Sequence, residues 1–122
     1  MGINSTEVSY SFGQLGSMMI IGSGAHTPPT GKVFVAITMI TDCQFDNTTG
    51  LVADNDVANG LEYMGTGTAA HDAALSPDLG ESGTGGDAVA NSIVFPKGVT
   101  IYGRWTSIDI ASSQHCVAYI GN

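Results

Sequence analysis

Short runs rich in Val, Ile, Thr and aromatic residues alternate along the chain with clusters of Gly, Pro, Asn and Ser. Runs of this kind, bounded by turn-forming residues, are typical of β-strands. No stretch of about 11 residues or more places its apolar residues at the 3.6-residue period of an amphipathic helix. The pattern therefore predicts an all-β fold, a single-domain antiparallel β-sandwich or jelly-roll-like barrel with long Gly-rich loops.

The clearest strand is expected over residues 32–42. Both of its faces are apolar, with Val33, Val35, Ile37 and Met39 on one and Phe34, Ala36 and Ile40 on the other. Apolar side chains on both faces are typical of a strand that is covered on two sides. This segment is therefore predicted to be a central strand of the sheet.

Further strands are expected where the same composition returns, over residues 8–12, 17–21, 50–53, 61–64, 92–95, 99–110 and 115–120. Residues 1–16 are predicted to form an arm or an edge strand, and residues 65–90 a long surface loop. Turns at residues 96–98 and 111–114 separate the last three strands, so residues 92–120 are predicted to form a meander of two successive hairpins. Gly103, in the middle of a strand, indicates a bulge or the close approach of a large neighbour such as Trp105.

Composition and charge narrow the classes of function. The chain has 122 residues, a length that fits one domain. Only 11% of its residues are charged, less than half of the usual share of about 25%. Asp and Glu number 11 against 3 Lys and Arg, for a net charge of -8, so no nucleic-acid partner is expected. A surface of neutral polar residues favours packing against other proteins.

The expected compartment follows from what the sequence lacks. No apolar run approaches the roughly 20 residues of a membrane-spanning helix, so no membrane partner is expected. The first residues lack the basic and apolar regions of a signal peptide, which predicts synthesis in a cytoplasm. There, Cys43 and Cys116 are expected to be reduced and buried rather than bonded to each other.

No constellation of residues points to an enzyme. His26, His71 and His115 lack the spacing of a zinc site, no Gly-x-Ser-x-Gly elbow is present, and the Gly-rich runs lack the Lys of a phosphate loop. The loop around Asp54 and Asp56 fails the glycine and glutamate positions of an EF-hand. Turn chemistry explains its acids, with a weak structural cation as the alternative. No cofactor and no metal are therefore predicted.

Three aromatic residues, Tyr102, Trp105 and Tyr119, lie on the expected C-terminal strands. Aromatic side chains bury large areas, and on the strands of a small β domain they are mostly core residues. The alternative is that they stack on a sugar, in an adhesin or carbohydrate-binding β-sandwich.

The C-terminal residues 94–108, with the sequence VFPKGVTIYGRWTSI, and the closing residues 117–121, VAYIG, resemble the tail of small virion structural proteins of tailed, marine-type bacteriophages. The resemblance covers about the last quarter of the chain and includes no catalytic motif. It implies an all-β subunit present in many copies on the particle. The small size favours a capsid decoration (cement) protein over a tail or fibre component. Such subunits commonly bind the major capsid protein as homotrimers and bridge neighbouring capsomers.

Two segments and one strand are expected to contact the shell or the next subunit. The interface is predicted to include Met1, Gly2, Ile3 and Asn4 in the N-terminal segment, Pro28 and Pro29 in the loop over residues 22–31, and Arg104 with Trp105. For Arg104 two roles remain open: a salt bridge or ring stacking within the subunit, or a pair with an acid of another subunit such as Asp87 or Glu81.

Overall fold

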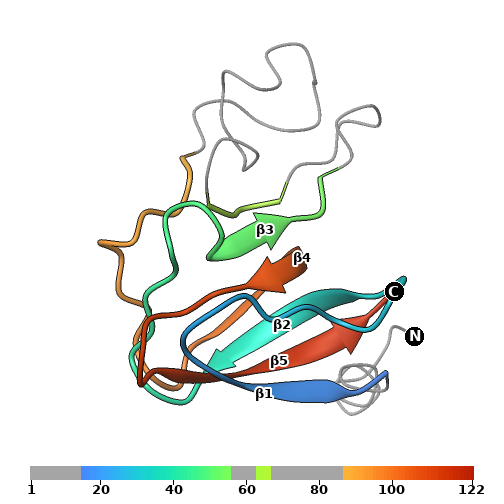
Figure 1. Ribbon diagram of the computed structural model, residues 1–122, viewed down its shortest axis with the longest axis horizontal. Coiled ribbons are helices and arrows are strands. Elements are labelled where there is room, and N and C mark those ends of the chain that lie inside the picture. The colour runs from blue at the N-terminus through green and yellow to red at the C-terminus, as the bar shows by residue number, and fades with distance from the viewer. Residues whose placement is uncertain (1–14, 56–62, 67–86) are drawn as a thin grey trace, which may run out of the picture.

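The computed structural model describes residues 15–55, 63–66 and 87–122. These residues contain strands and no helix, so the predicted all-β class is confirmed. The strands are β1 (Ser17–Ile21), β2 (Val33–Met39), β3 (Leu51–Ala53), β4 (Thr100–Ile108) and β5 (His115–Gly121). They form one open antiparallel sheet in the order β1-β5-β2-β4-β3 (Figure 1). The finer choice between sandwich and barrel stays a prediction.

β2 lies at the centre of this sheet, as predicted, but the described residues form a core against only one of its two faces. It pairs with β4 on one side and with β5 on the other. The predicted C-terminal meander is therefore incorrect, because β4 and β5 flank β2 instead of pairing with each other. The turn at residues 111–114 does form, with the Gln114 amide donating to the Ala111 oxygen. The segment before it leaves the sheet because Ile110 is buried in the core.

An irregularity in β2 decides which of its side chains face the core. The register with both neighbours shifts between Phe34 and Ala36. An extra residue at such a bulge reverses the alternation of side chains. Phe34 consequently joins Ile37 and Met39 in the core cluster, although simple alternation predicted that it faces the other way.

Gly103 lies opposite this irregularity on β4, and both features predicted for it are present. The register of β2 against β4 shifts beside it, and a Cβ at Gly103 would lie 2.7 Å from Cζ2 of Trp105. The indole ring therefore lies over the backbone of its own strand, where only glycine leaves room.

The core lies against one face of the sheet. Strand side chains supply most of it, including Ile20, Phe34, Ile37, Trp105, Ile108, Cys116 and Ala118. Irregular segments supply the rest, and isolated bridges join Cys43 to Phe95 and Phe45 to Ile110. The rings of Phe45 and Phe95 meet edge to face with centroids 5.2 Å apart.

Several expected strands differ in extent. Residues 17–21 form β1 as predicted, whereas residues 92–95 contribute only the bridge at Phe95. Tyr63 and Met64 are not in a strand. The predicted strand over residues 8–12 and most of the loop over residues 65–90 lie outside the described residues.

Candidate interaction site

The structure describes only part of the predicted interface. Met1, Gly2, Ile3 and Asn4 lie outside the described residues. Pro28 is half-buried and Pro29 exposed, in the loop between β1 and β2.

Trp105 was predicted to lie in the interface, and the structure corrects this prediction. Its side chain is fully buried, and its indole Nε1 donates to the main-chain oxygen of Met64 at 2.8 Å. Trp105 is a core residue, because burying its large apolar ring stabilises the fold more than leaving the ring exposed to solvent would. It is therefore available neither to a neighbouring subunit nor to a sugar.

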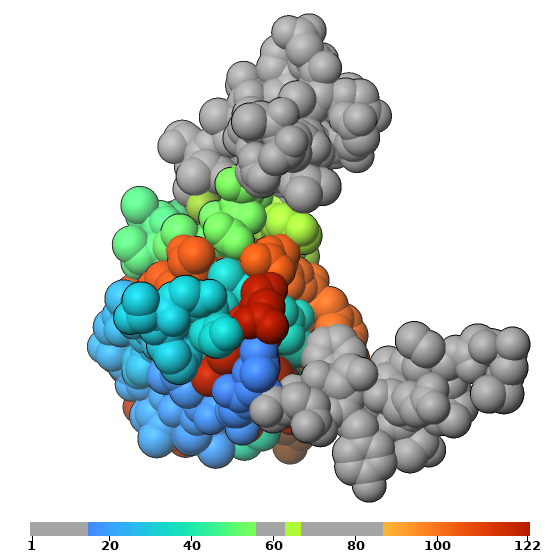
Figure 2. Space-filling view, turned by 90° about the vertical axis from the view of Figure 1, so that its right-hand side faces the viewer, coloured from blue at the N-terminus to red at the C-terminus, as the bar shows by residue number. Residues whose placement is uncertain are grey.

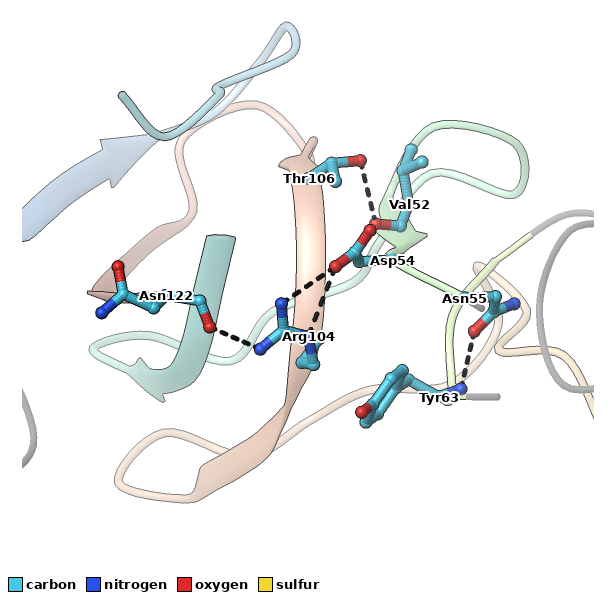
Figure 3. A network of polar contacts seen from close by, with 7 residues as sticks. All are labelled: Val52, Asp54, Asn55, Tyr63, Arg104, Thr106 and Asn122. Atoms are coloured by element: carbon cyan, nitrogen blue, oxygen red, sulfur yellow. Dashed lines mark hydrogen bonds and ion pairs between the residues drawn. The ribbon is translucent and has the colours of Figure 1, made fainter. Parts of the chain in front are cut away.

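Arg104 joins three segments that are distant in the sequence. Its Nε and Nη2 donate to Oδ2 of Asp54 at 3.3 and 3.1 Å, and its Nη1 donates to the main-chain oxygen of Asn122 at 2.6 Å. Figure 3 shows this network, and Figure 2 shows the C-terminal end of the chain (red) at the surface beside β4 (orange). Arg104 thus has the intramolecular role, and a pair with another subunit stays a prediction.

The face of the sheet opposite the core has no covering layer among the described residues. We call the part of this face over β1, β5, β2 and the first residues of β4 the open face, and define it by the side chains of Ser17, Met19, Ile21, Ala36, Thr38, Thr100, Tyr102, His115, Val117 and Tyr119. None of these residues is Asp, Glu, Lys or Arg. Met19 is 58% exposed, Ile21 54% and Tyr102 61%. Exposed apolar side chains gathered on one surface mark a contact with another protein or a ligand.

Strand register arranges the open face into rows. One row runs from Ser17 through Tyr119 and Ala36 to Tyr102. Ala36 is 1% exposed because it lies between the two tyrosines. The result is an aromatic pair that straddles a small residue, a shape suited to a flat apolar partner surface.

The next row begins at Met19 and passes through Val117 and Thr38 to Thr100. The hydroxyls of Thr38 and Thr100 are hydrogen-bonded to each other at 2.8 Å. These polar groups are thus satisfied within the sheet, which leaves the row with a largely apolar surface for a partner.

A polar depression of about 540 Å³ lies away from the open face, among the irregular segments. Its lining includes Ser23, Gly24, Gln44, Asp46, Asn91 and Asp109. The Thr49 hydroxyl lies within hydrogen-bond distance of both carboxylates, at 3.1 Å from Asp46 Oδ2 and 2.9 Å from Asp109 Oδ2. Amides and carboxylates in a concave site are groups that bind polar ligands such as sugars.

Hydrogen bonds already hold both carboxylates of this depression in place. The amides of Thr49 and Thr48 and the Thr49 hydroxyl donate to Asp46, and they lower the pKa of its carboxyl below the ordinary value. The Gly24 amide donates to Oδ1 of Asp109 at 3.1 Å. The two acids therefore also serve to close loops.

The two cysteines are buried and free. Burial, followed by the neighbouring Cys43, raises the pKa of Cys116 to about 12, and burial also raises the pKa of Cys43. Thiols of this kind are poor nucleophiles at neutral pH. Within the part of the chain that the structure describes, no three His, Cys, Asp or Glu side chains gather as a metal site, and no helix has the length and hydropathy to cross a membrane.

Reasoning from the sequence missed Met19 and Ile21 as functional candidates. The run Ser17–Ile21 was correctly predicted as a strand, but a strand with apolar residues on both faces does not show which face is covered. The one available signal is that positions 18 to 21 are all apolar, so one face of β1 must expose large side chains unless something covers it.

Comparison with known proteins identifies no relative. No family model matches the chain, and no curated protein or solved structure is significantly similar to it.

Proposed function

We propose that this chain is a non-enzymatic structural subunit of a virion. In this proposal it is a capsid decoration (cement) protein that binds the outer surface of a phage shell in many copies. The observation that carries the assembly role is the open face, an uncharged surface with exposed Met19, Ile21 and Tyr102. The choice of a phage shell rests on the resemblance of the C-terminal residues.

The chemistry of the open face supports contact with a protein. The centre of a protein interface is depleted in charged residues and enriched in aromatic residues and Met. The open face has this composition, with Tyr102, Tyr119 and Met19 exposed or half-buried on it. In the proposal the tyrosine row is the part that contacts the major capsid protein. The homotrimer implied by the resemblance stays a prediction.

The test is co-sedimentation of the purified protein with phage shells that lack it. We expect a fixed ratio of this chain to the shell protein in the pellet. We expect Tyr102→Ser to weaken shell binding roughly ten-fold, because aromatic side chains are the commonest energetic centres of interfaces. This weakening is expected without a change in the β circular dichroism spectrum.

Ile93→Ser is the matched control for this experiment. Ile93 is 45% exposed, but it lies in the loop that contributes Val89 and Phe95 to the core side of the sheet. We expect this variant to bind shells as the wild type does. Wild-type protein that stays in the supernatant, or equal losses in both variants, contradicts the proposal.

Carbohydrate binding by an adhesin is the second candidate, and the polar depression favours it. With Trp105 buried, the sugar would contact the Asp46 and Asp109 carboxylates and the Gln44 and Asn91 amides. A glycan array tests it directly. Specific binding that Asp109→Asn abolishes would support this function, and silence of the array across all glycans would count against it.

A further inference from the structure

The two edge strands of the sheet, β3 and β1, differ in whether their outward backbone groups are hydrogen-bonded. At the β3 edge, Thr66 is 3% exposed and caps the strand. Its hydroxyl accepts from the Leu51 amide at 2.9 Å, and its own amide donates to the Leu51 oxygen at 2.8 Å. Edge groups satisfied in this way cannot pair with another strand. Nothing of this kind occurs at β1 within the described residues.

The hydrogen-bond pattern shows which groups of β1 face outward. The Ile120 amide donates to the Gly16 oxygen at 2.9 Å, and the Gly22 amide donates to the Gln114 oxygen at 3.0 Å. Bonded pairs alternate along an antiparallel ladder, so the even-numbered residues carry the bonds to β5. The amides and carbonyls of Ser17, Met19 and Ile21 therefore point away from the sheet.

β1 also lacks the features that protect an edge strand from pairing. It contains no charged residue, no proline and no glycine, and its register with β5 has no bulge. Natural proteins use such features to prevent contact between exposed edges. The same three residues that direct their backbone outward also place their side chains on the open face.

Charge and symmetry favour a second copy of this chain as the partner of the β1 edge. The chain has a net charge of -8, so two copies repel except where their surfaces are uncharged. β1 and the neighbouring part of the open face are such a surface. Ser17 and Ile21 are also equally spaced about Met19, so that under a two-fold axis a small side chain on one copy meets a larger one on the other.

We propose that β1 pairs antiparallel with β1 of a second copy of this chain. The two-fold axis passes through the Met19 pair, and the two sheets join into one continuous sheet. Met19 of each copy then exchanges amide and carbonyl bonds with Met19 of the other, and Ser17 does so with Ile21. The two open faces become one surface, and this pairing holds whether or not the protein binds a shell.

A charge-reversal experiment tests the symmetry of the contact. Light scattering of the wild type should give a mass that rises from monomer to dimer with concentration, because strands of five residues bury less than the about 800 Å² per partner of a standard interface. Met19→Lys and Met19→Glu each place like charges opposite one another. Each variant should associate at least about ten-fold more weakly, and mixing the two should restore the dimer.

A backbone variant tests the edge itself. Met19→Pro removes an amide that points away from β5, so the fold should be retained as for proline on other edge strands. It should abolish the dimer, whereas Met19→Thr, which keeps the amide and favours a strand, should retain it. Circular dichroism and the urea midpoint of each variant separate loss of pairing from loss of folding.

Three results would overturn this proposal: a wild type that is monomeric at every concentration, an oligomer that neither charge variant weakens, or two charge variants that do not rescue each other. A trimer that Met19→Lys and Met19→Glu leave intact is an instance of the second result, and it leaves the proposed shell-binding role in place. Conversely, a confirmed dimer that does not co-sediment with shells contradicts the proposed function alone.

Discussion

Gly103 and Trp105 show how one missing side chain determines the placement of a large one. A Cβ placed at Gly103 would lie 2.7 Å from Cζ2 of the Trp105 ring, closer than packed carbon atoms approach. The indole Nε1 donates a hydrogen bond to the main-chain oxygen of Met64. The ring cannot move away without losing either its burial or its hydrogen bond. At the residue level, the position of the Trp105 ring therefore depends on the absence of a side chain at Gly103.

This close packing predicts that Gly103→Ala destabilises the fold by about 1–3 kcal/mol, the usual cost of overpacking a core. Urea unfolding measures the loss. In combination with Trp105→Phe, whose smaller ring leaves room for the new methyl group, the two losses should be less than additive. Additive losses in this double-mutant cycle would show that the indole ring is not the obstacle.

The cysteines make a second prediction at this scale. With a pKa of about 12, Cys116 should have a thiolate fraction at pH 8 roughly a thousand-fold below that of an ordinary thiol. A thiol reagent such as a disulfide dye should therefore label neither cysteine rapidly until the chain is unfolded by guanidinium. Rapid labelling of one thiol in the folded protein would contradict this.

The raised pKa of Cys116 also makes the free energy of unfolding depend on pH. Unfolding returns the Cys116 pKa from about 12 towards the ordinary thiol value of 9.0, so the folded state holds the proton more tightly. This contribution is complete below pH 9.0 and is lost as the pH rises towards 12.

At the scale of elements, β3 depends on a side chain that lies outside the sheet. Thr66 supplies the edge with both a donor and an acceptor, because its amide and hydroxyl reach the two backbone groups of Leu51. Leu51 is fully buried, so no water is available to replace these bonds. A strand of only three residues is thus held in place by one threonine.

Thr66→Val preserves the shape of the side chain and removes its hydroxyl. We expect a loss of about 1–3 kcal/mol in the free energy of unfolding, because the Leu51 amide is left buried without an acceptor. Thr66→Ser keeps the hydroxyl and should lose less, about 0.8 kcal/mol for one methyl group. A valine variant at least as stable as the serine variant would show that the hydroxyl is not what holds β3.

At the scale of the whole molecule, the two sides of the sheet differ in character. The loop side contains the polar depression with Asp46 and Asp109, while the open face contains no charged residue. The Arg104 network lies at the end of the sheet and links β4, the residue after β3 and the C-terminal end of the chain. It ties together segments that approach each other only in the folded state.

Arg104→Ala should therefore destabilise the fold, although modestly. The side chains of Arg104 and Asp54 are 33% and 40% exposed, so solvent screens the pair and we expect a loss of about 0.5–1 kcal/mol. Arg104→Lys should fall between the wild type and the alanine variant, since one ammonium group cannot reproduce the fork geometry. An alanine variant as stable as the wild type at low salt would contradict a structural role.

Periodicity predicted individual strands well and their arrangement poorly. β1 has the predicted limits, and β2, β3, β4 and β5 each lie within a few residues of the predicted segments. Strand composition is a local property, so it is visible in the sequence. The meander was wrong because the burial of Ile110, which draws its segment away from the sheet, depends on partners distant in the sequence.

The all-β class, the central place of β2 and the close packing at Gly103 can be predicted from the amino-acid sequence, because each follows from local side-chain pattern and size. The order β1-β5-β2-β4-β3 depends on contacts between segments that are distant in the sequence. The reversal of Phe34 into the core, the burial of Trp105 and the exposure of Met19 and Ile21 depend on which face of the sheet is covered. That choice is made by long-range packing, which a period of two residues cannot encode.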